Sequence, residues 1–436
     1  MALLCLSTVL DKTALHHLTL ISEALLSMNG RVTMLGISRW TESGGSYRTI
    51  QRFFGKSLPW CRMQWSLIRL QLSGGEDVIL LAGDETTVTK SGKETYGLGR
   101  YFSSIYNRAV PGLSFFTVSL VSVRLRKAFP ILIEQAVKET TPKEARKAVS
   151  KKNKKVKKKP GRPKGCLNKN KHNPELSEHL LWMQALLRNV LRLIGGSLTP
   201  VYFLYDNALA RNQGVAMLKA LYLHLISKLK CNAALWFPSD GEYGGRGAPR
   251  KYGEKVDYSN IPDAYLKDSE VTDGILTDIY QMSVLHKLFS CMLNVVIIRK
   301  TNVKTGRVAQ VVLFSTDLEL AWDKVIEYYR LRFQIEFNFR DAKQYWGLED
   351  FMNIGSTQVY NAANLSMFMV NLSHALRQRD EFSGMSVLDL KAWFKAGKFV
   401  RETLKQLQQT VDDVFISRVA ANVARLGRIH PPAAVL

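Results

Sequence analysis

The sequence predicts a mixed α/β protein, and three observations support this fold class. The 436 residues are enough for two or three domains, and a hydrophobic fraction of 46% can fill their cores. Apolar runs rich in β-branched residues, typical of strands, occur together with longer runs of helical period. In the central part the order of segments is three strands, then helix, strand, helix and strand. That order predicts a mixed sheet with helices packed on it.

The first region, residues 1–75, is expected to be helical and to bind DNA. A short helix is predicted over Val32–Trp40, followed by the turn TESGG and a second helix, SYRTIQRFF, capped by Ser46. This second helix carries Arg48 and Arg52, residue types suited to phosphates and base edges. The pattern is that of a helix-turn-helix. A plain helical bundle, which also uses helix pairs with Gly turns, is the alternative.

The next region, residues 76–237, carries the predicted sheet. Each strand is an apolar run bounded by polar or turn residues, and the two helices have an apolar face. The strands are expected at 77–88, 114–125, 128–137, 201–205 and 231–237, and the helices at 176–194 and about 212–229.

Residues 238–317 have a different texture and are expected to form a β-rich insertion. A Gly-rich basic loop is followed by a hairpin of LNVVIIRK and VAQVVLFS, joined by the turn TNVKTGR. Residues 318–346 are then predicted to form one long helix ended by Gly347, so that 318–350 completes the core. The last region, 351–436, is expected to be helical and is the candidate for dimerisation.

Charge and cysteine content narrow the class of partner. Lys and Arg outnumber Asp and Glu by 61 to 37, a net charge of +24, which suits a polyanion such as nucleic acid. The five cysteines form no CxxC pair, so neither a disulfide framework nor a zinc site is indicated and a reducing cytoplasm is expected. Residues 2–10 make a poor signal peptide, and no apolar run approaches 18 residues. No membrane partner is therefore expected.

The densest charge lies in an arm at residues 140–173. Between Lys143 and Lys171 there are 14 Lys or Arg and one acid, for a net charge of +13. The arm ends in KKPGRPKG, which resembles an AT-hook: Arg162 would lie in a narrow minor groove and Lys164 would contact phosphates. A solvated basic linker is the alternative.

One face of the predicted long helix carries a distinctive set of side chains. Tyr329, Arg332, Glu336 and Lys343 are spaced by 3, 4 and 7 residues, which places them on one face. A carboxylate flanked by Arg and Lys suits a site that holds both a metal and phosphates. A surface helix with i,i+4 ion pairs explains the spacing equally well.

Two further carboxylates favour the site. Asp84 follows the apolar run ILLAG, and Asp206 follows VYFLY, so each is expected at the end of a strand, where α/β proteins tend to bind ligands. With Glu336 they offer oxygen ligands for two Mg²⁺ ions, for which Mn²⁺ could substitute. Asp206 is the least distinctive of the three, since Asp240 and Asp257 lie downstream.

These residues resemble those of a known family. The run YYRLRFQIEFNFRDAKQYWGLEDF matches the YREK signature of bacterial insertion-sequence transposases of the DDE type, at Tyr329, Arg332, Glu336 and Lys343. LLAGDETTVTKSGKETYGLGR is similar to the segment around that family's first catalytic Asp, and VYFLYDNALARN to the second. FSTDLEL, before the final helix, is also similar. The resemblance covers about residues 76–350.

The resemblance implies a ribonuclease-H-like core with a β-rich insertion between Asp206 and Glu336. It implies two-metal phosphoryl transfer that excises a mobile element at its terminal inverted repeats and joins it to target DNA, by a homodimer in the bacterial cytoplasm at the nucleoid. Tyr329, Arg332 and Lys343 would position terminal phosphates, and a Trp (Trp236 or Trp322) could stack on a flipped base. The alternatives are an inactive transposase-derived DNA-binding protein and a ribonuclease-H-like nuclease without strand transfer.

Overall fold

The computed structural model describes residues 2–41, 44–72, 76–103, 107–137, 174–241, 245, 250–405 and 412–424. The chain divides into two compact units. The first comprises Met1–Gln135, Ala185–Asp206 and Asp323–Leu436, and the second comprises Ala136–Gln184 and Asn207–Trp322.

The first unit begins with short helices, as the sequence predicts. They are η1 (Ala2–Leu6), α1 (Lys12–Ser27), α2 (Met34–Trp40), α3 (Tyr47–Gly55) and α4 (Trp60–Leu72). The predicted cap of the second helix of the pair is confirmed, since Ser46 Oγ accepts a hydrogen bond from the Thr49 N–H. The first helix of the pair begins at Met34, two residues later than predicted, because the Thr33 hydroxyl caps it through the Gly36 N–H.

The sheet of the first unit confirms the four strands predicted at 77–88, 114–125, 128–137 and 201–205. Its strands are β1 (Ile79–Thr89), β2 (Gly99–Ser103), β3 (Arg108–Ser122), β4 (Lys127–Gln135) and β5 (Tyr202–Leu204). β3 pairs antiparallel with β1, β2 and β4, while β1 pairs in parallel with β5. The sheet is therefore mixed, with β1 between an antiparallel and a parallel neighbour.

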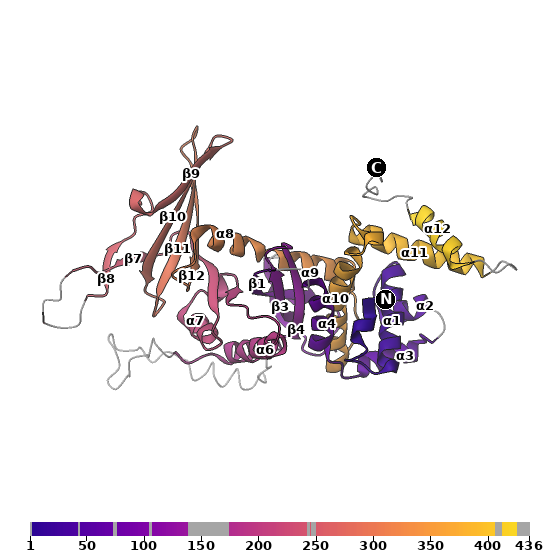
Figure 1. Ribbon diagram of the computed structural model, residues 1–436. Helices are drawn as coiled ribbons and strands as arrows, with labels where there is room; N and C mark the ends of the chain where they lie inside the picture. Colours follow the sequence, from indigo (N-terminus) through magenta and orange to yellow (C-terminus); the bar gives the residue numbers. More distant parts are fainter. Residues whose placement is uncertain are drawn as a thin grey trace. The chain divides into compact units, whose positions relative to one another are not determined.

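A long helix, α10 (Ser356–Arg377), forms the core of the first unit together with α4 and β4 (Figure 1). Sixteen of its residues are buried, including Asn361, Asn364 and Asn371. Asn361 accepts a hydrogen bond from Trp60 Nε1 at 2.7 Å and donates to the carbonyls of Phe54 and Lys56, both at 2.7 Å. These buried amides tie α10 to helices about 300 residues earlier in the chain.

The prediction of one long helix over 318–346 is wrong. The structure has two helices, α8 (Trp322–Leu331) and α9 (Gln334–Gln344), separated by a turn at Arg332 and Phe333. Across this turn the backbone bonds tighten to i→i−3, from the Arg332 N–H to Tyr329 O at 3.2 Å and from the Glu336 N–H to Phe333 O at 3.0 Å. The pattern of apolar residues continues through the turn, so the turn could not be predicted from it.

Two later helices complete the first unit, α11 (Val387–Leu404) and α12 (Asp413–Ala424), with the short η4 (Asp380–Phe382) before them. α11 packs against both α1 and α12. The helix predicted at 176–194 is confirmed as α6 (Glu178–Ile194), which crosses the boundary of the two units.

The second unit is a largely antiparallel sheet, and its predicted hairpin is confirmed (Figure 1). β11 (Met292–Asn302) pairs antiparallel with β12 (Val308–Ser315), which in turn pairs with β6 (His224–Leu229). β10 (Ile275–His286) lies on the other side of β11 and pairs with β9 (Leu266–Thr272) and β7 (Leu235–Pro238). β8 (Tyr252–Lys255) extends the edge beside β7, and the short helices η2 (Asn207–Leu209) and η3 (Asp263–Tyr265) lie in connections.

The prediction of one helix over about 212–229 is wrong in its second half. The helix α7 (Asn212–Lys219) ends there, and Tyr222 takes a left-handed conformation with φ 59° that breaks the helix. Residues His224–Leu229 form β6 instead, because four of them pair with β12. The predicted strand 231–237 begins later, at Leu235.

The basic arm at 140–173, with Arg162 and Lys164, lies outside the described residues. Among the helices that the described ranges contain, none is long and apolar enough to cross a membrane.

Candidate active site on strand β1

Asp84 lies within β1 rather than at its end, since the strand continues to Thr89. The expectation of a strand-end position is therefore wrong for Asp84: β1 stays paired with β3 through this segment, with Asp84 opposite Thr117. The preceding residue must be glycine, because a Cβ on Gly83 would lie 2.7 Å from Phe203 and 3.0 Å from Tyr205. The rings of Phe203 and Tyr205 are stacked over this point.

Asp206 reaches the same region through β5. The parallel register sets Leu81 opposite Phe203 and Ala82 opposite Leu204. Continued by two residues, that register places Asp206 beside Asp84. Burial raises the pKa of Asp84, and the nearby charge of Asp206 raises it further.

Glu336 is brought to β1 by Arg332. The Arg332 guanidinium donates to Asp84 Oδ2 at 2.9 Å through Nη1 and to Glu336 Oε1 at 3.0 Å through Nη2. The Arg332 side chain is only 14% exposed, against 20% for Asp84 and 40% for Glu336. A buried guanidinium thus joins a strand carboxylate and a helix carboxylate that are about 250 residues apart.

The other two members of the predicted helix face lie along the same strand. Tyr329 interacts with Arg332, and burial raises the pKa of its phenol. Lys343 donates from Nζ to Thr87 O of β1 at 3.0 Å and forms an ion pair with Glu349 at 3.3 Å. Although the helix is broken, all four residues of the face therefore point toward the polar end of β1.

Burial shapes the electrostatics of this cluster. Burial raises the pKa of Asp84 above its ordinary value, while Arg332 and the Glu85 N–H, which donates to Asp84 at 2.8 Å, act against that shift. Burial also raises the pKa of Tyr205, and the charges of Glu85, Asp206 and Asp84 raise it further. The phenol of Tyr205 therefore stays protonated and offers a donor among the acids.

Tyr205 and Glu85 were not predicted as site residues. Each adjoins a predicted acid in the sequence, and this adjacency is the one signal that could have identified them. In a strand neighbouring side chains point to opposite faces, so adjacency alone does not place a residue in a site.

The cluster suits a divalent cation by the chemistry of its donors. Asp84 and Glu336 both direct an oxygen at one cationic group, the Arg332 guanidinium, and carboxylate oxygens are the ligands that Mg²⁺ prefers. Within the described parts of the chain, however, no three acidic, His or Cys side chains are close enough together to hold one ion. Arg332 occupies the position between the two carboxylates.

The remaining predicted residues lie elsewhere. Arg48 and Arg52 are exposed on α3 of the first unit. Trp236 and Asp257 belong to the second unit. There Lys287 Nζ lies 4.5 Å from the centroid of the Trp236 ring. Asp257 accepts from the Ser259 N–H at 2.9 Å, which gives it a local role in a turn. Asp240 and Trp322 are in the same unit.

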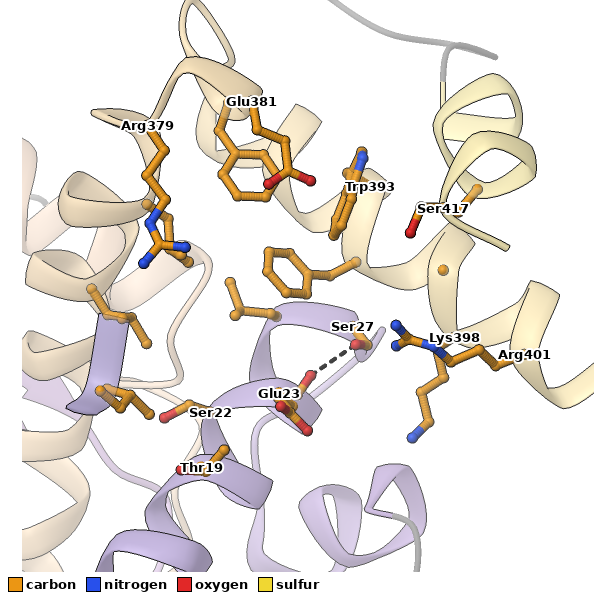
Figure 2. Close-up of a pocket in the computed structure, with 18 of the residues that line it drawn as sticks. Thr19, Ser22, Glu23, Ser27, Arg379, Glu381, Trp393, Lys398, Arg401 and Ser417 are labelled. Carbon is orange, nitrogen blue, oxygen red and sulfur yellow. Dashed lines mark hydrogen bonds between the residues drawn. The ribbon is translucent and has the colours of Figure 1, made fainter. Parts of the chain in front are cut away.

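The first unit also holds a cavity of about 290 Å³, formed by α1, α10, α11 and α12 (Figure 2). Its wall is aromatic and apolar, with Phe382, Trp393 and Phe394, and it includes Lys398 and Arg401 of α11. None of the three acids lines it. The cavity is therefore separate from the carboxylate cluster.

Carboxylates gathered with Arg and Lys beside one strand of a mixed sheet have the chemistry of enzymes that act on phosphodiesters. Comparison with known families agrees with this class. The family described as DDE superfamily endonuclease matches residues 5–273, more than half of the chain, and the chain belongs to this family. The matched residues include Asp84 and Asp206, and Glu336 lies beyond them. No curated protein matches the chain.

Members of this family are nucleases that act on DNA, and the family supports a transposase-like activity for this chain. Its fold, a mixed α/β arrangement built on a mixed sheet, is compatible with a DDE nuclease.

Proposed function

We propose that the protein is a DNA transposase that cleaves the ends of a mobile element and joins them to target DNA. The observation that carries this proposal is the Arg332 bridge, which joins the Asp84 and Glu336 carboxylates at 2.9 Å and 3.0 Å. A structural ion pair needs one acid per guanidinium. Two acids on one Arg, with a third carboxylate beside them, concentrate negative charge in a way that a stable fold does not require.

Asp84, Asp206 and Glu336 are proposed to hold two divalent cations, Mg²⁺ with Mn²⁺ as a substitute. When bound, such cations supply charge that stabilises the attacking and leaving oxygens of an in-line phosphoryl transfer. For this, Arg332 must leave at least one of its two carboxylates. Its guanidinium would then face a phosphate of the DNA, for which its planar donors are equally suited.

The other side chains along β1 position the substrate. Lys343 is a point charge near the DNA backbone, and Tyr329 and Tyr205 offer hydroxyl donors beside the acids. These residues correspond to the YREK class of bacterial insertion-sequence enzymes, with a ribonuclease-H-like core, and that assignment is part of the proposal. A homodimer on paired terminal inverted repeats, by a cut-and-paste route in the bacterial cytoplasm, follows from it.

DNA contact away from the cluster is assigned to Arg48 and Arg52 of α3 and to Arg162 and Lys164 of the arm. The exposure of Arg48 and Arg52 supports this assignment, since their guanidinium groups are accessible to phosphates. About six to ten phosphate contacts would make the affinity for DNA fall steeply as the salt concentration rises.

The decisive experiment compares two acids on neighbouring helices, Glu336 of α9 and Glu327 of α8. A supercoiled plasmid that carries the reading frame with its native flanking DNA is incubated with the wild type, Glu336→Gln and Glu327→Gln in Mg²⁺. Glu327 is the matched control, because it is a partly exposed carboxylate on α8 whose partners are Lys324 and Arg126.

We expect Glu336→Gln to lose about a thousandfold in cleavage, since metal-assisted charge stabilisation contributes several kcal/mol and each 1.36 kcal/mol is a factor of ten. Glu327→Gln should cleave at the wild-type rate, and both variants should bind the DNA. Cleavage by Glu336→Gln at the wild-type rate would sink the proposal. Cleavage without joining to a second plasmid would favour a nuclease that lacks strand transfer. Binding without cleavage by the wild type would favour an inactive DNA-binding protein.

A further inference from the structure

The first unit has a second surface with the chemistry of a nucleic-acid site, away from the carboxylates. A groove of about 520 Å³ lies between the end of α2 and the end of α11. Its volume falls within the range of small-ligand sites. It is lined by Arg39, Trp40, Thr41, Lys398, Phe399, Glu402 and Lys405.

Two aromatic rings line this groove. Trp40 and Phe399 come from helices more than 300 residues apart in the chain, and their centroids are 6.0 Å apart at an interplanar angle of 47°. Phe399 is 50% exposed, although burial of a Phe side chain would stabilise the fold. Trp40 is partly buried, so Phe399 is the more accessible of the two rings, and its face offers a surface on which a planar group can stack.

The charge around the rings is positive. Arg39, Lys398 and Lys405 line the groove with a single acid, Glu402, which pairs with Lys405 at 2.9 Å. Lys395, one turn before Phe399, holds its ammonium 5.6 Å from the centroid of that ring. A phosphate beside a stacked base would therefore meet cations on both sides of the rings.

We propose that this groove binds an unpaired DNA strand, with a base stacked on the Trp40 and Phe399 rings and its phosphates against Arg39 and Lys398. Aromatic rings interleaved with cations are the features by which proteins hold single strands without reading sequence. An acidic peptide would use the same cations, but its acidic side chains have no planar ring that could stack on Phe399 and Trp40. The inference is independent of the carboxylate cluster, because no residue of the groove belongs to it.

The test measures binding of a fluorescein-labelled oligothymidine and of the same oligomer in a duplex, in EDTA so that cleavage plays no part. The full chain is compared with Trp40→Ala, Phe399→Ala and the control Phe102→Ala. Phe102 is a matched control because it is a 64% exposed aromatic on β2.

Removing either ring should weaken single-strand binding about tenfold, in line with what stacking of a base on an aromatic ring contributes. Phe102→Ala should bind as the wild type does, and the duplex should be affected less than threefold by any of the three changes. Phe399→Leu keeps the apolar contact with Trp40 and so separates loss of stacking from loss of folding; it should show the same tenfold loss.

A second readout locates the strand. Ultraviolet crosslinking of an oligomer with 5-bromodeoxyuridine, followed by peptide mass spectrometry, should label peptides that contain Trp40 or Phe399. Equal single-strand affinity of the wild type, Trp40→Ala and Phe399→Leu would overturn the proposal. So would crosslinks confined to other peptides, or binding of a poly-glutamate peptide that competes as well as the oligothymidine does.

Discussion

The carboxylates on β1 and the amides on α10 are polar groups of the same compact unit, but they are satisfied in different ways. Asn361 uses its amide fully, with one hydrogen bond accepted and two donated, all to groups that never change charge. Asp84 and Glu336 instead share one guanidinium, and Glu336 remains 40% exposed. The hydrogen bonds of Asn361 join neutral groups within the core and so stabilise the fold. A charged cluster that shares a partner and reaches solvent is available to a ligand.

The largest stability effect is expected from the amide network. Asn361→Ala removes three hydrogen bonds and leaves Trp60 Nε1 and two backbone carbonyls without partners inside the core. We expect the free energy of unfolding to fall by about 3 kcal/mol, since each buried group left unpaired costs about 1–3 kcal/mol and relaxation recovers part of it.

Urea denaturation measures this change. The matched control is Asn189→Ala, an exposed Asn of helix α6, which should alter stability by less than about 0.5 kcal/mol. A similar loss in both variants would mean that the network on α10 contributes nothing beyond its helix.

Loss of a partner at the carboxylate cluster is expected to strengthen cation binding, whereas loss of a partner in the amide network weakens the fold. Arg332→Gln leaves Asp84 and Glu336 without their shared cation, and a divalent ion can then neutralise both. We expect Mn²⁺ to bind about tenfold more tightly to Arg332→Gln than to the wild type in the absence of DNA, equal to about 1.4 kcal/mol of coupling.

Titration of Mn²⁺ followed by electron paramagnetic resonance reports this affinity without any cleavage assay. The double change Asp84→Asn with Arg332→Gln should return the affinity to the wild-type value or below. Equal affinity of the wild type and Arg332→Gln would show that Arg332 does not compete with cations at all.

A smaller change in stability, which depends on pH, is expected at Glu134 of β4. Its carboxyl group lies beside Tyr360 of α10. Burial raises the pKa of Glu134 from its ordinary 4.5 to about 7, with Tyr360 of α10 as its hydrogen-bond partner. Because the folded pKa is the higher one, the stability that this group contributes is complete below pH 4.5. It is lost as the pH rises through 7.

Glu134→Gln removes that dependence. At pH 8 the variant should be more stable than the wild type by about 1 kcal/mol, a value discounted for solvent screening. At pH 5 it should have no advantage. Thermal unfolding at both pH values measures the difference, and an equal gain at pH 5 and pH 8 would contradict the assigned cause.

Elements that depend on local sequence could be predicted, and those that depend on distant contacts could not. Strands β1, β3, β4 and β5 and the cap at Ser46 follow local rules, so apolar runs and a single hydroxyl were enough to predict them, whereas the short β2 was not predicted. The side chains of the helix face could be predicted by their spacing. The turn at Arg332 could not be predicted, because a short run of i→i−3 hydrogen bonds leaves the apolar pattern unchanged.

Contacts between residues distant in the chain could not be predicted from the sequence either. The stretch after Lys219 has apolar residues that suit a helix or a strand, and pairing with β12, about 90 residues later, decides between them. The amides of α10 are visible in the sequence, but nothing local shows that Asn361 contacts Trp60. The family membership and the geometry on β1 together support the proposed site, and the roles of its residues stay predictions until they are tested.

The way in which the first unit is assembled has a consequence for synthesis on the ribosome. Its three segments are separated in the chain, and both the Arg332 bridge and the Asn361 bonds join its first segment to its last. Contacts of such long sequence separation form slowly and late. A nascent chain that has emerged only as far as Asp206 holds two of the three proposed acids and neither Arg332 nor Glu336. If the proposed triad is correct, the growing polypeptide gains a complete set of acids only after translation passes Glu336.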